Sequence, residues 1–147
     1  MTERRKLKFA DTAAAAAEVE RLRKGYTQVG EWTLPQACKH LDMAIRYSMK
    51  PAPGRNIKKT FVKWGLLRLI LGLGRIPAGI AAPKHINPPD ETPDSAIDDF
   101  LGALREMKDF TGEFAPHPML GKIKRRQYVR LHLIHCAHHL GFLRPVE

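Results

Sequence analysis

Hydrophobic positions along this chain recur with the 3.6-residue period of an α-helix in four separate segments. These segments are residues 12–24, 33–50, 94–111 and 124–142. In the third of them, for example, Ile97, Phe100 and Leu104 fall on one face, while acidic residues gather at the start. No stretch shows the two-residue alternation of a half-buried strand. The pattern therefore predicts an all-α fold built from four amphipathic helices.

The residues that flank these segments are typical of helix ends. Asp11 is the expected N-cap of the first helix, and Thr33 with Gln36 makes the capping-box pattern of the second. Thr92 followed by Pro93 is the expected start of the third. Helix-ending residues follow the four segments in turn, namely Gly25, Pro51, Gly112 and Pro145.

A fifth segment, FVKWGLLRLILGL at residues 61–73, is the most apolar part of the chain. It is too short to cross a bilayer, which needs about 20 residues, and it includes Lys63 and Arg68. We expect an accessory helix that packs over the other helices or into a homodimer interface, with no membrane association. It lies in a long irregular connection that continues to Pro93. The prediction is one domain, residues 1–147, folded as an up-down four-helix bundle with a long crossover between helices 2 and 3.

Composition limits the kinds of binding partner and the cellular compartment that we expect for this protein. A chain of 147 residues with 44% hydrophobic content fits a single core. The formal net charge of +10 permits nucleic acid as a partner, but the basic residues are dispersed and the few aromatic ones do not interleave with them. Nucleic acid is therefore not the expected partner. Cys38 and Cys136 suggest no disulfide framework, and MTERRKLKF leads into no apolar signal segment, so we expect a cytoplasmic protein.

Four histidines gather on one face of the last predicted helix. Setting each residue ~100° from the previous one places seven side chains within about 60° of one line. They are Tyr128, Leu131, His132, His135, His138, His139 and Phe142. His135 and His139, one turn apart, could converge on a metal ion, although a hydrogen-bonded core cluster or a pH-responsive surface would give the same pattern. The wheel does not choose between this pair and pairs that include His132 or His138. Cys136 stands where the H-E-x-x-H motif of zinc proteases has its glutamate, which excludes that motif.

A further histidine, His40, lies in the middle of the second predicted helix on the same face as core-type residues. Cys38 points to the opposite side of that helix, as expected for a small buried thiol rather than a ligand beside His40. His85 and His117 fall in predicted loops, and the sequence shows no evident partner for His117. His40 is therefore the candidate third ligand from outside the last helix.

Four motifs are similar to one known superfamily. They are RRKLKFAD, GEWTLPQACKHLDMAI, GRIPAGIAAPK and RLHLIHCAHHLGFLRP. With these motifs the chain resembles, over nearly its whole length, the DinB-like (YfiT-like) superfamily of metal-dependent four-helix bundles, and most closely a branch classed as a domain of unknown function. By position, the resemblance implies that His40, His135 and His139 bind a divalent ion such as Zn, Ni, Fe or Mn. It leaves His132 and His138 as neighbours of the site rather than ligands.

Two features depart from the superfamily pattern. Leu140 and Gly141 stand where many relatives have an Arg-Gly or similar pair. The last helix also begins with Lys124, Arg125 and Arg126, and each cation near a helix N-terminus is unfavourable by a few tenths of a kcal/mol. A docked anion would offset this effect, so we expect these cations to help draw an anionic ligand in.

Three neutral imidazoles without a carboxylate leave at least one coordination position open, which is typical of a catalytic rather than a structural metal site. An ion in such a site makes a bound water or thiol nucleophilic near neutral pH. The resemblance implies a metal-dependent thiol transferase or hydrolase whose small-molecule substrate could be an anionic low-molecular-weight thiol. Two other classes stay open: a non-catalytic binding or stress-response bundle, and a nucleic-acid-associated basic protein. The sequence assigns no catalytic residue.

Overall fold

The computed structural model describes residues 3–50, 61–76, 86–117 and 120–146. Within these ranges the fold is mostly helical, with five helices and one small sheet. The helices are α1 (Thr12–Arg23), α2 (Leu34–Met49), α3 (Phe61–Leu73), α4 (Ser95–Asp109) and α5 (Arg125–Leu140). Among them, no helix has the length and apolarity needed to cross a membrane.

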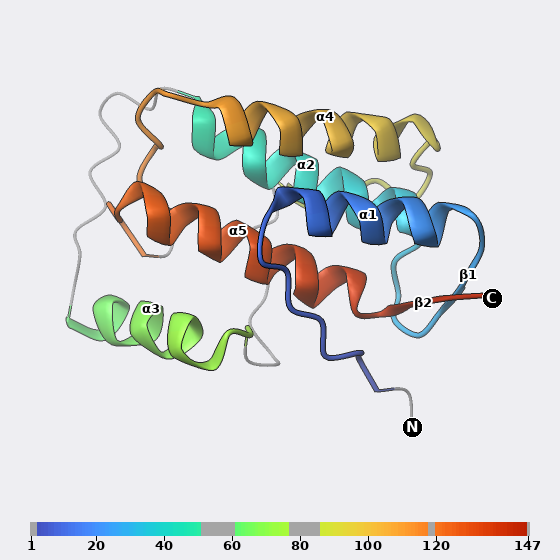
Figure 1. The fold of residues 1–147 in the computed structure, drawn as a ribbon, viewed down its shortest axis with the longest axis horizontal. Coiled ribbons are helices and arrows are strands. Elements are labelled where there is room, and N and C mark those ends of the chain that lie inside the picture. The colour runs from blue at the N-terminus through green and yellow to red at the C-terminus, as the bar shows by residue number, and fades with distance from the viewer. Residues whose placement is uncertain (1–2, 51–60, 77–85, 118–119, 147) are drawn as a thin grey trace.

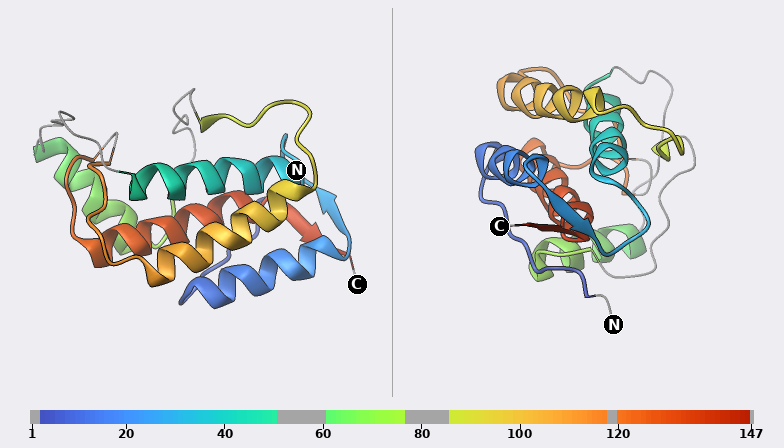
Figure 2. Two further views of the ribbon diagram at one scale, coloured as in Figure 1. Left: turned by 90° about the horizontal axis from the view of Figure 1, so that it is seen from above. Right: turned by 90° about the vertical axis from the view of Figure 1, so that its right-hand side faces the viewer.

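Four of the helices, α1, α2, α4 and α5, lie roughly alongside one another (Figures 1 and 2). Following the colour along each ribbon shows that α1 and α5 run one way, whereas α2 and α4 run the other (Figure 1). A strict up-down order would instead make α2 and α4 antiparallel. The long crossover between them, residues 50–94, accounts for the difference, because it returns the chain to the end from which α2 started.

The structure also contains a two-stranded sheet, so the expectation of a purely helical fold is wrong. β1 (Tyr26–Gln28) pairs antiparallel with β2 (Leu143–Pro145), with Tyr26 opposite Pro145 and Gln28 opposite Leu143. Each strand has three residues, which is too few for an alternating pattern to be recognised. The sheet fastens the connection between α1 and α2 to the chain that leaves α5, and it does so beside the C-terminal end of α5.

One apolar core lies between α1, α2, α4 and α5. Each of these helices contributes large side chains that are fully buried, such as Leu22, Leu41, Phe100 and Leu140. Burial of a side chain of this size contributes about 1.5–3 kcal/mol to folding. The core therefore fixes α2 against α5 and determines which faces of these two helices meet.

Helix α3 has the predicted bounds and packs against α5 outside this core. Its Leu67, Ile70 and Leu71 form a second apolar cluster with Leu131 and Ile134 of α5. Three large side chains of α3 remain exposed, Trp64, Leu69 and Leu73. The prediction of an accessory apolar helix in the crossover is confirmed.

The expected helix starts are confirmed at α1 and α2 but not at α4. Asp11 accepts a hydrogen bond from the Ala14 N–H at 2.8 Å, and the Thr33–Gln36 capping box is complete. Thr92, however, donates its hydroxyl to the Pro89 carbonyl, and α4 begins only after Asp94, whose side chain makes no capping bond. The hydroxyl of Thr92 stabilises the preceding turn instead of the helix.

Candidate metal centre

Three histidines from two helices meet at one place in the structure. His40 of α2 and the pair His135 and His139 of α5 each direct one ring nitrogen into a cluster in which these nitrogens lie within 4.8 Å of one another. His40 is fully buried, whereas His135 and His139 are half-buried. The two helices are held together by the core, and His135 and His139 share a face because they are one turn apart.

The ring nitrogens face one another at short distances. His135 Nε2 lies 3.0 Å from His40 Nε2 and also 3.0 Å from His139 Nε2. Each pair of rings is inclined by 68–74°, so the rings approach edge to face rather than stacking. Nitrogen, rather than the apolar ring faces, therefore lines the centre of the cluster.

The main chain sets the protonation state of His40. His40 Nδ1 lies 2.7 Å from the carbonyl oxygen of Ile86, and a carbonyl oxygen can only accept a hydrogen bond. Nδ1 must therefore bear a proton, and in a neutral ring the Nε2 atom of His40 then presents a lone pair to His135. This arrangement, with one nitrogen donating to a carbonyl and the other free to coordinate, is the usual one for a metal-binding histidine.

Hydrogen bonds alone do not account for both short contacts. With a lone pair on His40 Nε2, a proton on His135 Nε2 can point at His40 or at His139, but it cannot be collinear with both. If His139 Nε2 instead donates a proton to His135 Nε2, the His135 nitrogen has no proton of its own. The lone pairs of His40 Nε2 and His135 Nε2 would then face each other without a proton between them. A metal ion bound to all three nitrogens satisfies every contact at once.

The spacing of the nitrogens also suits an ion. Four-coordinate zinc with Zn–N bonds of about 2.0–2.1 Å separates neighbouring nitrogens by roughly 3.3 Å. Two of the three separations are 3.0 Å, close to this value, and all three nitrogens lie within 4.8 Å of one another, so a small rotation of the His40 or His139 ring completes the site. The donor set therefore fits a divalent ion that accepts imidazole ligands.

Burial keeps the three rings in the neutral form that binds metals. Loss of hydration lowers the pKa of His40 from its ordinary value, although the hydrogen bond to Ile86 opposes this. Burial, and then the charge that neighbouring rings would acquire, lowers the pKa of His135 and His139 well below 6.5. The positive charge of Arg4 lowers the pKa of His139 further. All of these effects on the two rings disfavour protonation.

Trp32 covers one side of the cluster and was not among the predicted site residues. Its ring stacks on His139 at a centroid distance of 5.0 Å and lies 4.8 Å from the ring of His40. Trp32 precedes the Thr33 cap of α2, so the same capping box that starts the helix also places the indole. In the sequence, the only indication that Trp32 lies at the site is its position next to a helix cap.

His132 is buried in a separate polar contact and is not part of the three-histidine cluster. Its Nε2 lies 2.9 Å from Ser48 Oγ, and Ser48 Oγ donates to the Ile45 carbonyl at 2.6 Å. His132 must therefore donate its Nε2–H to Ser48. Its ring stacks on Tyr128, and burial lowers its pKa to about 3. The serine proton is engaged with a carbonyl, so this pair is a packing contact rather than a nucleophile and base.

His138 lies beside the cluster and faces Arg4 instead of the other nitrogens. The Arg4 guanidinium donates to His138 Nδ1, and the His138 ring lies edge-on to His139 at 4.8 Å. The prediction that His138 neighbours the site agrees with this position. His117, for which the sequence shows no evident partner, accepts a hydrogen bond from the Leu120 N–H at 3.2 Å. His85 lies outside the described residues.

The cations at the start of α5 are far from the cluster. At 1.5 Å per residue, Lys124–Arg126 precede His135 by roughly 15 Å along the helix. Arg125 lies over the rings of Phe110 and Phe114 instead. The structure therefore does not support these residues as the source of charge beside the metal centre.

Three further polar side chains, those of Gln36, Asp42 and Glu113, belong to structural contacts. Asp42 pairs with Arg46, and Glu113 pairs with Lys122 at the surface. Gln36 completes the capping box and also donates to the Pro89 and Asp90 carbonyls, which ties α2 to the end of the crossover.

The fold and the site define a class of protein: a mostly helical domain in which three histidines from two packed helices could hold a metal ion. A family model described as "Protein of unknown function (DUF1569)" matches residues 1–146. The chain belongs to this family. Comparisons with curated proteins and with solved structures gave no match.

Proposed function

We propose that this chain is a DinB-like four-helix-bundle metalloprotein in which His40, His135 and His139 bind one divalent ion. The observation behind the proposal is the pair of 3.0 Å contacts at His135 Nε2, only one of which a hydrogen bond can satisfy. The Ile86 carbonyl supports it further, because it fixes the His40 tautomer that has a free Nε2 lone pair.

The reaction we propose is thiol transfer or hydrolysis on a small molecule. The three ligands are neutral, so a bound divalent ion retains its full charge and can make a coordinated water or thiol nucleophilic near neutral pH. The protein's own residues determine the setting: Ile86 orients His40, Trp32 shields the rings from solvent on one side, and the partial exposure of His135 and His139 leaves an approach for a substrate.

The first test is metal content in protein purified without a histidine tag. We expect about one divalent ion per chain in the wild type and a strong loss in His40→Gln, His135→Gln and His139→Gln. His138→Gln is the matched control, because it removes an imidazole from the same helix without removing one of the three converging nitrogens. Loss of metal in His138→Gln with retention in His139→Gln would show that the ligand assignment is wrong.

The second test separates a catalytic site from a non-catalytic one. Cobalt-substituted protein should develop a sulfur-to-cobalt charge-transfer band when a low-molecular-weight thiol is added, because the three histidines leave a position open. The His135→Ala variant should not show the band. A cobalt spectrum indifferent to every added ligand would mean a closed coordination shell, and the non-catalytic binding module would then be the better account.

A further inference from the structure

A cation lies beside the three-histidine cluster, on the N-terminal segment that precedes α1. Arg4 is half-buried, donates to His138 Nδ1, and has its guanidinium carbon 5.9 Å from the centre of the Phe142 ring. The His138 ring in turn lies 4.8 Å from His139. One imidazole therefore separates the guanidinium of Arg4 from a proposed metal ligand.

The segment that contains Arg4 is fastened to the end of α5 by its neighbour, Arg5. The Arg5 N–H donates to the Gly141 carbonyl at 2.8 Å, and its side chain donates to the Leu143 carbonyl at 2.8 Å. The same guanidinium pairs with Glu18 of α1 at 2.5 Å, and both partners are largely buried. Arg5 thus fixes the backbone at this point, and Arg4 is held where it lies rather than being free in solvent.

Gly141 allows this close approach. A Cβ atom at position 141 would lie 2.7 Å from the Arg5 carbonyl oxygen and 2.8 Å from Arg4 Cγ. Gly141 has φ −63°, a conformation that any residue can adopt, so the requirement for glycine is one of space rather than of backbone freedom. The missing side chain makes room for the N-terminal segment, and for Arg4 in particular.

The positive charge of Arg4 is not balanced by an acid among the residues that the structure describes. No carboxylate in these ranges forms an ion pair with Arg4, and the pKa of Arg4 is lowered by burial and then by the positive charge of Arg75. The cluster itself contains only neutral rings. Such an arrangement attracts an anion, and arginine binds carboxylates and related groups through paired N–H donors.

We propose that Arg4 is the anion-recognition residue of this centre. It binds the carboxylate, or a group of similar charge, of a small molecule whose sulfur or oxygen donor reaches the ion held by His40, His135 and His139. This inference rests on the proposed metal-binding function and adds to it the chemical class of the ligand. His138 is then a positioning residue, which holds the guanidinium toward the site by accepting one of its hydrogen bonds.

The test compares two thiols on cobalt-loaded, tag-free protein. Mercaptoacetate and 2-mercaptoethanol offer the same donor, but only the first has a carboxylate. We expect wild-type protein to bind mercaptoacetate about tenfold more tightly, measured from the charge-transfer band. Arg4→Gln should abolish this preference while leaving the affinities for cobalt and for 2-mercaptoethanol near their wild-type values.

Two further variants control for charge and for position. Arg126→Gln removes the same charge from the far end of α5 and should keep the tenfold preference. Gly141→Ala retains Arg4 but displaces it, so it should weaken the preference in the same direction as Arg4→Gln.

These experiments distinguish a failure of the role of Arg4 from a failure of the proposed metal site. An unchanged preference in Arg4→Gln, with cobalt and thiols still bound, would overturn the role of Arg4 and leave the metal site intact. Absence of cobalt binding in the wild type would overturn the proposed function, and this inference with it. Equal loss of preference in Arg4→Gln and Arg126→Gln would mean that net charge, and not Arg4, attracts the anion.

Discussion

At the scale of single residues, the central feature is how the environment of each histidine determines its chemistry. His40 and His132 are both buried histidines on facing helices, but their hydrogen bonds differ. His40 donates its Nδ1–H to a carbonyl, whereas His132 donates its Nε2–H to a hydroxyl. His40 is thereby left with a lone pair directed at other nitrogens, whereas the Nε2 atom of His132 is occupied by its own proton. Helical periodicity placed both on inward faces and could not have separated them.

The tryptophan beside the cluster provides a direct report of metal binding. The chain has two tryptophans, Trp32 at the cluster and Trp64 on α3. In a Trp64→Phe variant, the fluorescence of Trp32 should be strongly quenched by one equivalent of Co²⁺. The paramagnetic ion would be bound by His139, whose ring stacks on the indole at a centroid distance of 5.0 Å. The matched variant, Trp32→Phe, should respond much less to the same titration. Equal quenching in both variants would place the ion away from the cluster.

Buried His132 should make the metal-free protein sensitive to acid. Its pKa is about 3 in the folded protein and about 6.5 when unfolded, so the unfolded chain binds a proton that the folded one does not. Stability should therefore fall as the pH drops below about 6.5, by roughly 1.4 kcal/mol per pH unit for this one proton. Urea unfolding of chelator-treated protein at pH 7, 6 and 5 should show a shallower loss in His132→Gln than in the wild type. Identical slopes would mean that His132 becomes protonated without unfolding.

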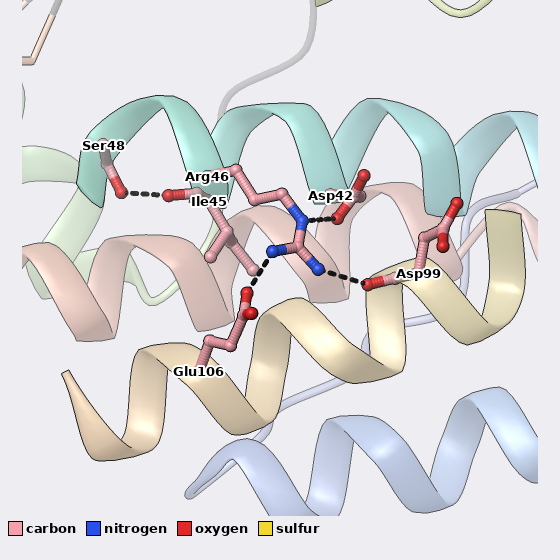
Figure 3. A network of polar contacts seen from close by, with 6 residues as sticks. All are labelled: Asp42, Ile45, Arg46, Ser48, Asp99 and Glu106. Carbon is pink, nitrogen blue, oxygen red and sulfur yellow. Dashed lines mark hydrogen bonds and ion pairs between the residues drawn. The ribbon is translucent and has the colours of Figure 1, made fainter. Parts of the chain in front are cut away.

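At the scale of secondary-structure elements, a partly exposed polar network joins α2 to α4. Arg46 donates to Asp42 at 2.6 Å and to the Asp99 carbonyl at 3.2 Å, and it also pairs with Glu106 (Figure 3). Asp42 is almost completely buried, so Arg46 compensates a charge that water cannot reach. The network holds α2, and with it His40, in a fixed position relative to α4.

Breaking this network should destabilise the protein more than breaking an exposed ion pair. We expect Arg46→Met to lower the free energy of unfolding by about 1–3 kcal/mol, because it leaves Asp42 buried without its partner. The control is Arg23→Met, which removes an equally short pair with the exposed Asp98 and should lower it by less than about 1 kcal/mol. Chemical unfolding of the two variants measures both values. Similar losses would mean that burial of Asp42 contributes little.

Much of the helical structure could be predicted from the sequence, because helices are specified locally. The capping box of α2 and the bounds of α3 follow from adjacent residues and a clear apolar period. The sheet could not be predicted, because Tyr26 and Pro145 pair across most of the chain and three residues show no period. The same limit applies to the site. The three histidines could be proposed with the help of the family resemblance, but the Ile86 carbonyl is a backbone atom and Arg4 approaches from the other end of the chain.

At the scale of the whole molecule, the fold brings together three distant parts of the chain at one end of α5. The N-terminal segment is hydrogen-bonded to Gly141, β1 pairs with the residues after α5, and the residue Ile86 reaches His40. The long crossover matters for the last of these contacts, because it returns the chain to α2 before α4 begins (Figure 1). The proposed metal centre therefore depends on tertiary structure and should be lost on unfolding.

Burial of the cluster also changes the expected pH dependence of metal binding. Unperturbed histidines would lose metal steeply near pH 6, since each must be neutral to bind. In the folded protein, burial lowers the pKa of His40 and lowers those of His135 and His139 well below 6.5. Affinity should therefore change little between pH 8 and about pH 6 and fall only at lower pH, with more than one proton taken up per ion released. Zinc titrations against a competing chelator at several pH values measure this, and a steep loss already centred near pH 6.5 would contradict it.

His40, His135 and His139 are proposed to direct their Nε2 atoms at a single ion. The most direct test is a crystal structure of the zinc-loaded, tag-free protein, with anomalous diffraction measured on both sides of the zinc absorption edge. We predict one strong anomalous peak per chain, at about 2.0–2.2 Å from each of the three Nε2 atoms, with His132 and His138 outside bonding distance. A peak bound by His132 or His138, or no peak between the three rings at full zinc loading, would contradict the account.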